Sequence, residues 1–270
     1  MPELPEVETT RRGLVPHLVG SRLTSVRVRD PRLRWPVPPE LGQVLTGARL
    51  TGLRRRAKYL LFDFDRGTLI AHLGMSGSLR LVAPDVPPLT HDHVLLGFGD
   101  VELRLNDPRR FGSLHWVEAP PETHFLLAHL GPEPLADGFD GSVLFAGSRG
   151  RRGAVKGFIM DARVVVGVGN IYATEALFRA GIRPSRSAGR IAAPRYDALA
   201  EAIRAVLAEA LVMGGTTLRD FVSSDGRPGY FKQSLAAYGR GGAPCRVCGQ
   251  VLRSTRIAQR ATVFCASCQR

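Results

Sequence analysis

The sequence is poor in lysine, has no long apolar run and has no cysteine before its last 26 residues. A membrane-spanning helix needs roughly 20 consecutive apolar residues, and no run approaches that length. The N-terminus is acidic and lacks the apolar core of a secretion signal. We therefore expect a cytoplasmic protein that has no membrane partner and whose thiols stay reduced.

The formal net charge is +13, because 37 lysines and arginines stand against 24 aspartates and glutamates. An excess of this size favours a polyanionic partner, above all nucleic acid. Only Lys58, Lys156 and Lys232 are lysines, so arginine carries almost all of the positive charge. A desolvated lysine can lose its proton whereas an arginine stays charged, so scarce lysines could mark places that need a titratable amine. The codon bias of a GC-rich genome would explain the same scarcity.

The first eight residues, MPELPEVE, combine a proline at position 2 with a neighbouring carboxylate. Methionine before proline is normally removed, so the mature chain should begin with the secondary amine of Pro2. A terminal amine has an ordinary pKa of about 8, so a useful fraction is neutral and can attack an electrophilic carbon to form an iminium. Glu3 could then act as an acid or a base. The alternative is an ordinary helix start, with proline in the first turn and carboxylates complementing the helix dipole.

The apolar periodicity predicts an α+β protein. Leu4, Val7, Leu14 and Leu18 share one face of a first helix that ends near Gly20. Short apolar or alternating runs between about residues 24 and 117, punctuated by turns and without helices between them, predict an antiparallel β-sandwich or barrel. Strands are expected at Tyr59–Phe64, Thr68–Leu73, Ser78–Val82, Val94–Phe98, Val101–Leu105 and Ser113–Val117.

The pattern becomes helical beyond residues 131–134, with helices expected at Ile171–Ala180 and Pro194–Met213. A glycine-rich stretch at residues 239–242 then precedes a small C-terminal module. We expect three domains: a β-sandwich over residues 1–133, a helical domain over 134–238 and a small module over 239–270.

The cysteines form two C-x2-C pairs separated by sixteen residues: Cys245, Cys248, Cys265 and Cys268. This spacing is typical of a zinc ribbon, in which two hairpins hold one tetrahedral Zn²⁺. A reducing compartment disfavours the alternative of two disulfides, and the clustering argues against four unrelated thiols. Four thiolates leave no open coordination position, so the predicted ion is structural and holds a basic hairpin.

Four further segments carry basic, aromatic or glycine residues in patterns that suit DNA. A basic cluster at residues 54–60 (RRRAKYL) opens a strand, and residues 72–78 (HLGMSGS) follow a strand end. Residues 106–112 (NDPRRFG) form a proline-initiated turn, and residues 166–172 (VGVGNIY) lead into a helix with Asn170 as its expected N-cap. An enzyme that acts on a base must unstack it, and inserted side chains can replace the lost contacts. Solvated charge and simple capping are the plain alternatives.

The N-terminal segment and these motifs together resemble the formamidopyrimidine-DNA glycosylases, bacterial enzymes that remove oxidised purines, along nearly the whole chain. The resemblance implies an N-terminal β-sandwich, a helical domain with a helix–two-turn–helix motif and a zinc-finger hairpin. It implies that Pro2 is the nucleophile, that Glu3 handles the sugar-oxygen proton and that Lys58 is an acid in base release and β-elimination. It also implies that Arg260, otherwise a solvated charge, touches the phosphate at the lesion and assists the last elimination.

The same resemblance implies DNA contacts. Met75 would fill the gap left by a flipped-out nucleotide, Arg109 would contact the orphaned partner base, and Phe111 would be the wedge. The remaining predicted contacts are His91, Arg151 and Asn170, of which Arg151 stands where lysine is common. Residues 223–230 resemble the loop that closes over oxidised guanine.

We therefore expect a monomeric DNA glycosylase and abasic-site lyase that acts on double-stranded DNA at the bacterial nucleoid. It should need one structural Zn²⁺ and no catalytic cofactor. An oxidised-pyrimidine glycosylase of the endonuclease VIII type is one alternative, although that branch usually has glycine where Leu4 stands. A non-catalytic zinc-dependent DNA-binding protein is the other, and only Pro2, Glu3 and Lys58 distinguish the enzyme from it.

Overall fold

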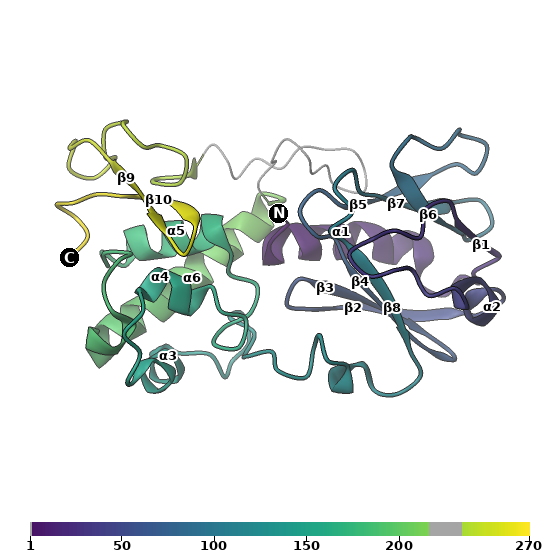
Figure 1. Ribbon diagram of the computed structural model, residues 1–270, viewed down its shortest axis with the longest axis horizontal. Helices are drawn as coiled ribbons and strands as arrows, with labels where there is room; N and C mark the ends of the chain where they lie inside the picture. Colours follow the sequence, from purple (N-terminus) through teal and green to yellow (C-terminus); the bar gives the residue numbers. More distant parts are fainter. Residues whose placement is uncertain (1, 216–233) are drawn as a thin grey trace. The chain divides into compact units, whose positions relative to one another are not determined.

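The structure is a computed structural model that describes residues 2–215 and 234–270. These residues form two compact units (Figure 1). The first contains residues 2–128 and 213–215, and the second contains residues 129–212 and 234–270.

The first unit combines helix α1 (Leu4–Leu18) with two four-stranded antiparallel sheets. One sheet has the strand order β1-β6-β7-β5, and the other has the order β2-β3-β4-β8. A short helix, α2 (Leu41–Leu45), precedes β2, and a 3₁₀ turn, η1 (Pro121–Thr123), follows β8. The strands are β1 (Ser25–Val28), β2 (Leu50–Arg56), β3 (Tyr59–Phe64), β4 (Gly67–His72), β5 (Ser78–Val82), β6 (Asp92–Gly97), β7 (Glu102–Asn106) and β8 (Ser113–Val117).

One apolar core joins the two sheets and α1. Leu14 of α1, Phe62 and Leu69 of one sheet, and Leu96 and Leu103 of the other are all buried in it. Complete burial of such a side chain contributes about 1.5–3 kcal/mol. A core of this size can fix the loops at its edges through ordinary packing.

The second unit contains helices and a small two-stranded ribbon. In the longest helix, Leu199, Ile203, Val206 and Ala210 form the predicted apolar stripe and are buried. The elements are α3 (Gly141–Ser148), α4 (Val155–Ile159), α5 (Asn170–Arg179), the 3₁₀ turn η2 (Ala188–Arg190), α6 (Ala193–Val212), β9 (Arg253–Ile257) and β10 (Arg260–Phe264).

The predicted α+β class and the β-sandwich are confirmed, and the predicted strands and helices lie within two residues of the observed ones. One local prediction is wrong, because residues 54–60 do not open a single strand. Arg54–Arg56 end β2, Ala57 and Lys58 form a turn, and β3 begins at Tyr59. Strand β1 was not predicted, because its four residues are too few for their alternation to stand out; three of the four are exposed in the structure.

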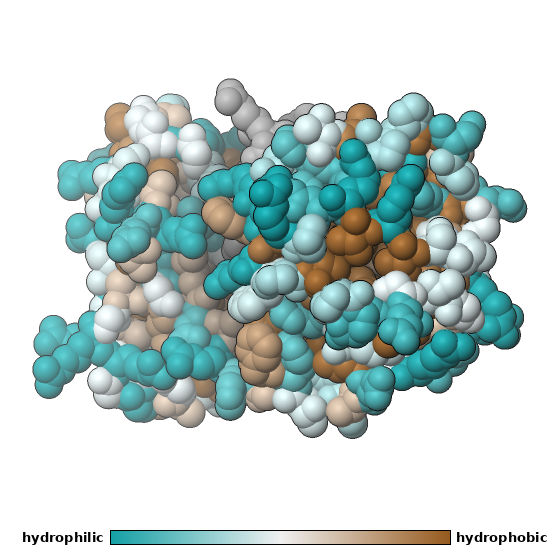
Figure 2. All heavy atoms as spheres, turned by 45° about the vertical axis from the view of Figure 1, so that its right-hand side comes forward, coloured by the Kyte–Doolittle hydropathy of each residue, from teal (hydrophilic) through white to brown (hydrophobic). Residues whose placement is uncertain are grey.

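No helix within the described ranges combines the length and apolar character needed to cross a membrane. In the space-filling view, hydrophilic side chains cover most of the visible face and surround a smaller group of apolar ones (Figure 2).

Candidate active site, nucleic-acid contacts and metal centre

Pro2 and Glu3 lie at the start of α1, and both are buried. Glu3 is the N-cap residue. Its backbone N–H donates to the Glu6 carboxylate at 2.9 Å, and the Glu6 backbone N–H donates back to the Glu3 carboxylate, which completes a capping box. The plain interpretation of this segment as a helix start is therefore confirmed. The chemical interpretation is compatible with it, because a carboxylate has more acceptor sites than one cap uses.

An ion pair links α1 to the hairpin between β2 and β3. Glu8 lies 3.3 Å from Arg55 of β2, and Arg55 also donates to the carbonyl of Ala57 in the turn at 2.9 Å. Burial would raise the pKa of Glu8, but hydrogen bonds from Arg11 and Arg12 and the charge of Arg55 hold it below its usual value. One partly buried salt bridge thus links the first helix to the hairpin whose turn carries a predicted catalytic residue.

Lys58 is the second residue of that turn. The first, Ala57, has a φ of 55°, which is uncommon for a residue other than glycine. Burial first, and then the charges of Lys58, Arg34 and His115, lower the pKa of His72 to about 4. Lys58 therefore acts electrostatically on the residue that ends β4, immediately before the loop that contains Met75.

Asp107 joins the Met75 loop to the turn that contains Arg109–Phe111. Its buried carboxylate accepts hydrogen bonds from the Ser76 hydroxyl at 2.6 Å and from the Gly112 backbone N–H at 2.8 Å. The Ser76 hydroxyl in turn accepts from the Arg109 backbone N–H at 3.1 Å. One side chain therefore fixes both loops.

The two loops also touch through their backbones. Gly74 has a φ of 62°, and a Cβ there would overlap the backbone of Phe111, so only glycine fits. Arg110 has a φ of 55°, and its guanidinium pairs with Asp30 at 2.7 Å. Arg109 lies 5.0 Å above the Phe111 ring, and Phe111 is 43% exposed. An exposed ring on a fixed turn is suited to stacking against a base.

His91 belongs to the same network. Its carbonyl accepts from the Asp107 backbone N–H at 3.0 Å. Nε2–H of the buried His93 donates to the Asp107 carbonyl at 2.8 Å. The contacts of Asp107 thus connect the loops of all the predicted DNA contacts in this unit: Met75, His91, Arg109 and Phe111.

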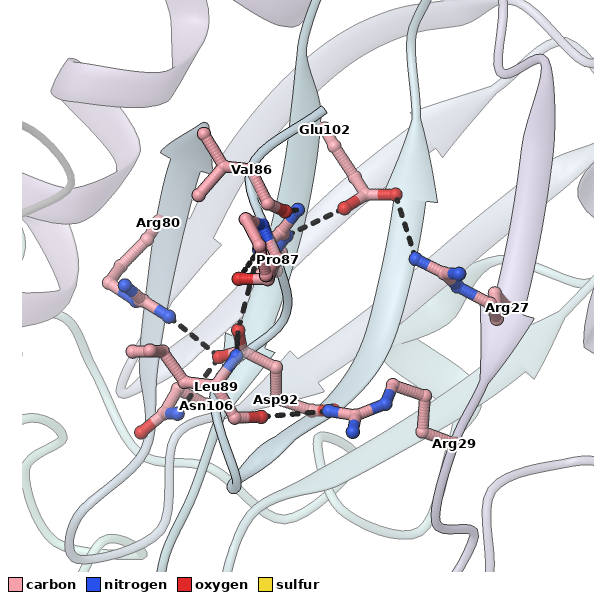
Figure 3. Close-up of polar contacts among 10 residues, drawn as sticks. Arg27, Arg29, Arg80, Val86, Pro87, Leu89, Asp92, Glu102 and Asn106 are labelled. Atoms are coloured by element: carbon pink, nitrogen blue, oxygen red, sulfur yellow. Dashed lines mark hydrogen bonds and ion pairs between the residues drawn. The ribbon is translucent and has the colours of Figure 1, made fainter. Parts of the chain in front are cut away.

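A second buried carboxylate, Asp92, holds the loop that precedes His91 (Figure 3). Burial would raise its pKa, but the surrounding donors lower it below its usual value. Arg104, also buried, donates to the carbonyls of Val86 and Pro87 in the same loop. The donors to Asp92, at 2.7–2.8 Å, are the Asn106 amide, the Leu89 backbone N–H and Arg80.

The Sγ atoms of Cys245, Cys248, Cys265 and Cys268 lie within 4.8 Å of one another. Two of the separations are 3.5 Å, between Cys248 and Cys265, and 4.0 Å, between Cys245 and Cys268. With Zn–S bonds of about 2.3 Å, neighbouring sulfurs of a tetrahedron lie roughly 3.8 Å apart. The four thiolates therefore fit one Zn²⁺ with no position left for a substrate.

Arg260 is the first residue of β10 and is exposed. The turn before it contains Ala258 and Gln259, with φ values of 48° and 59°. Lys156 of α4 is buried, and its Nζ donates to the Ala261 carbonyl at 3.1 Å and to the Thr262 hydroxyl at 2.8 Å. A buried ammonium group is costly unless it is hydrogen-bonded, so Lys156 serves to hold the strand that Arg260 begins.

Asn170 is the first residue of α5, and Gly169 is the N-cap, so the expectation of an Asn170 cap is wrong. The N-cap position needs an extended backbone, which Gly169 adopts. The side-chain oxygen of Asn170 is buried and has no hydrogen-bond partner within the described part of the chain. Arg151 is exposed in the loop after α3, where its backbone bonds to Ser148 and Gly189.

The predicted residues thus divide between the units. The first unit contains Pro2, Glu3, Lys58, Met75, His91, Arg109 and Phe111, and the second contains Arg151, Asn170, Arg260 and the four cysteines. The predicted closing loop at residues 223–230 lies outside the described residues.

Three residues that hold the loops were missed from the sequence: Asp107, Lys156 and Glu175. The Glu175 carboxylate accepts three backbone N–H groups of residues 236–238 at 2.7–2.9 Å, which anchors the segment before the ribbon. A lone acidic residue between Asn106 and Pro108 in a basic turn was a usable signal for Asp107. Glu175 gave none, because its partners lie at least 61 residues away. The scarcity of lysine singled out Lys156, but not its structural role, because its partners are more than 100 residues away.

The β-sandwich, the helical unit and the four-cysteine ribbon together correspond to the domains of a DNA glycosylase. Three family models match the chain: the formamidopyrimidine-DNA glycosylase N-terminal domain at residues 1–114, its H2TH domain at 130–222, and the zinc finger found in FPG and IleRS at 242–270. The chain belongs to the formamidopyrimidine-DNA glycosylase family.

Full-length relatives agree with the family models. The chain is 64% identical to a formamidopyrimidine-DNA glycosylase of Methylococcus capsulatus and 61% identical to one of Alkalilimnicola ehrlichii, with all of each chain covered. The MutM (FPG) protein of Thermus thermophilus has a TM-score of 0.89 at 41% identity, covering 99% of this chain and 98% of its own. The Lactococcus lactis Fpg in complex with DNA that contains an abasic site has a TM-score of 0.93 at 33% identity, covering 99% of both chains.

Proposed function

We propose that this protein is a bifunctional DNA glycosylase and abasic-site lyase that removes oxidised purines, such as 8-oxoguanine and formamidopyrimidines, from double-stranded DNA. The proposal rests on full-length family membership together with the buried Pro2–Glu3 pair at the start of α1. Lactococcus lactis proteins of the same fold have been solved with DNA that contains Fapy-dG or an abasic site. One structural Zn²⁺ holds the ribbon.

The chemistry is assigned to the N-terminus. After removal of Met1, the Pro2 nitrogen attacks C1′ of the damaged nucleotide, and the base departs with the glycosidic bonding electrons and a proton. Glu3 transfers the proton at the sugar ring oxygen as the ring opens, and the amine loses its own proton to give an iminium. The iminium accepts the electrons released in β-elimination and then in δ-elimination, so no further electron sink is needed. Lys58 acts as an acid in base release and β-elimination.

The remaining residues bind DNA. Met75, Arg109 and Phe111 replace the contacts that the extruded nucleotide loses. His91, Arg151, Asn170 and Arg260 hold the DNA backbone, and Arg260 also assists the last elimination. The protein acts as a monomer at the bacterial nucleoid in the cytoplasm. Its domains are residues 1–133, 134–238 and 239–270.

Borohydride trapping tests the proposal directly. Wild-type protein incubated with a duplex that contains 8-oxoguanine should form a covalent adduct after reduction, and peptide mapping should place the link at Pro2. Attachment at Lys58, or excision without an adduct, would overturn the mechanism. Faster excision from a duplex that contains an oxidised pyrimidine than from one that contains 8-oxoguanine would favour the endonuclease VIII alternative. Binding without excision of any lesion would indicate the non-catalytic alternative.

A further inference from the structure

The second unit carries a concentration of arginines, and the proposed function uses only one of them, Arg151. Two hollows, of about 580 and 530 Å³, lie side by side and share Ser187 and Arg190. Their arginines are Arg151, Arg152, Arg183, Arg186, Arg190 and Arg270, all exposed, and we call them the arginine track.

The six side chains of the arginine track form no salt bridge among the described residues, and the carboxylate of Asp161, which feels the charge of Arg151, is itself paired with Arg163. No aspartate or glutamate of the described ranges lines either hollow. Elsewhere in this unit, by contrast, Arg163 pairs with Asp161 and Arg179 pairs with Glu209. Unpaired like charges repel one another, and a bound anion removes that repulsion.

Backbone hydrogen bonds fix the segments that carry these arginines. Gly189 N–H and the Ser187 hydroxyl both donate to the Arg151 carbonyl, at 2.9 and 3.1 Å. Val155 N–H donates to the Arg186 carbonyl at 2.8 Å, and Arg183 N–H donates to the Arg270 carbonyl at 3.2 Å. The segments near residues 151, 186 and 270 are therefore held together, and the guanidinium groups stand on an ordered surface.

We propose that the arginine track binds the phosphate backbone of duplex DNA beyond the phosphates next to the lesion. Guanidinium groups form paired hydrogen bonds with phosphate oxygens, and a row of them matches the regular phosphates of a duplex better than one compact anion. The hollow with Arg151, itself a predicted DNA contact, continues through Arg190 into the other hollow. The inference rests on the proposed function, because it extends a DNA contact assigned there.

The test measures how binding depends on salt. Arg186→Gln combined with Arg190→Gln removes two phosphate contacts and should reduce the slope of log Kobs against log[salt] by about 1.8, since each contact contributes about 0.9. The effect should appear on an undamaged duplex of about three helical turns and should be smaller on one of about one turn. The matched control, Arg22→Gln with Arg66→Gln, removes the same charge from exposed arginines of the first unit and should leave the slope unchanged.

An unchanged slope for the 186/190 variant would overturn the arginine track as a DNA contact. An equal reduction in the control would also overturn it, because net charge alone would then explain the binding. Inorganic phosphate that competes with wild-type binding no better than chloride at equal ionic strength supports the duplex backbone over a site for a small anion. Borohydride trapping by wild-type protein is scored separately, so its failure would overturn the proposed function and leave the salt measurement readable.

Discussion

The two units hold their exposed loops by different means. In the first, a large apolar core joins two sheets and α1, and the buried Asp107 ties together the loops of the predicted DNA contacts. In the second, the ribbon has only a small apolar cluster, and its hairpin depends on four cysteines and on Lys156. Loops on a large core can be positioned by hydrogen bonds, whereas a ribbon too small to bury much surface needs a metal.

The largest expected effect comes from Glu3→Gln. This variant should lose the chemistry proposed for the first unit and keep the affinity for DNA. Gln keeps the side-chain oxygen that accepts the capping hydrogen bond but cannot transfer a proton. A positioned acid typically contributes about 10²–10⁴-fold, so release of 8-oxoguanine should fall by that order in single-turnover assays. Cleavage and trapping at a ready-made abasic site should persist in part, because that aldehyde is already electrophilic.

Duplex affinity should change little in the same variant, since loss of one negative charge does not weaken attraction to phosphate. Glu3→Ala, which also loses the cap, should cost about 1 kcal/mol of stability in addition. Wild-type excision by Glu3→Gln would leave this residue with its capping role alone.

Cys248→Ser tests the four-cysteine metal site that holds the ribbon of the second unit. It should lose Zn²⁺ and most DNA affinity, because metal binding contributes about 10 kcal/mol or more to folding such a module. Far-ultraviolet circular dichroism should stay near that of the wild type, since the sandwich and the helices have their own cores. Metal content and duplex affinity provide the measurements, and normal DNA binding by the zinc-free variant would contradict the role given to the ribbon.

Arg109→Ala and Phe111→Ala test the exposed ends of the loops that Asp107 holds. A base–aromatic contact is worth about 1–3 kcal/mol, so excision from duplex DNA should fall roughly tenfold or more. Cleavage at an abasic site should fall less, because no base has to be extruded there. Equal losses on the two substrates would indicate a plain binding defect.

Asp107→Ala tests the network itself. It leaves the buried donors of Ser76 and Gly112 without an acceptor, at a cost of about 1–3 kcal/mol each. The control is Leu103→Ala, in the apolar core at β7, the strand that ends just before Asp107. It should lower the free energy of unfolding by about 2–5 kcal/mol without changing the contacts of these loops. Only Asp107→Ala should lower the ratio of 8-oxoguanine excision to abasic-site cleavage. The same ratio in both variants would reduce Asp107 to a stabilising residue.

The smallest effect concerns pH and belongs to the first unit. Burial lowers the pKa of both His72 and His115 from 6.5 to about 4; the charges of Lys58 and Arg34 add to this effect at His72, and His124 adds to it at His115. The unfolded chain therefore takes up protons that the folded chain refuses, and stability should decline as the pH falls from about 6.5 to about 4. Thermal unfolding of His72→Gln should show a weaker decline than the wild type. The control, His17→Gln at the exposed end of α1, should decline as steeply as the wild type. An equally steep decline in His72→Gln would contradict this assignment.

Features with a local cause were predicted from the sequence. The spacing of Cys245, Cys248, Cys265 and Cys268 predicted the ribbon, because two ligands with only two residues between them must share one turn. A short apolar run predicted β3, the alternation of apolar residues predicted β5, and a 3.6-residue stripe predicted α6. Family resemblance supplied the roles predicted for Pro2 and Glu3, which no periodicity contains.

Tertiary structure alone decided how the functional loops are held. The partners of Asp107, Lys156 and Glu175 lie in other segments, and local patterns cannot report such pairs. The left-handed backbones of Ala57, Arg110, Ala258 and Gln259 are equally unreadable, since none of these residue types favours that conformation. These positions flank Lys58, Arg109, Phe111 and Arg260, because strained backbone persists where the surrounding contacts fix it and a side chain must be aimed.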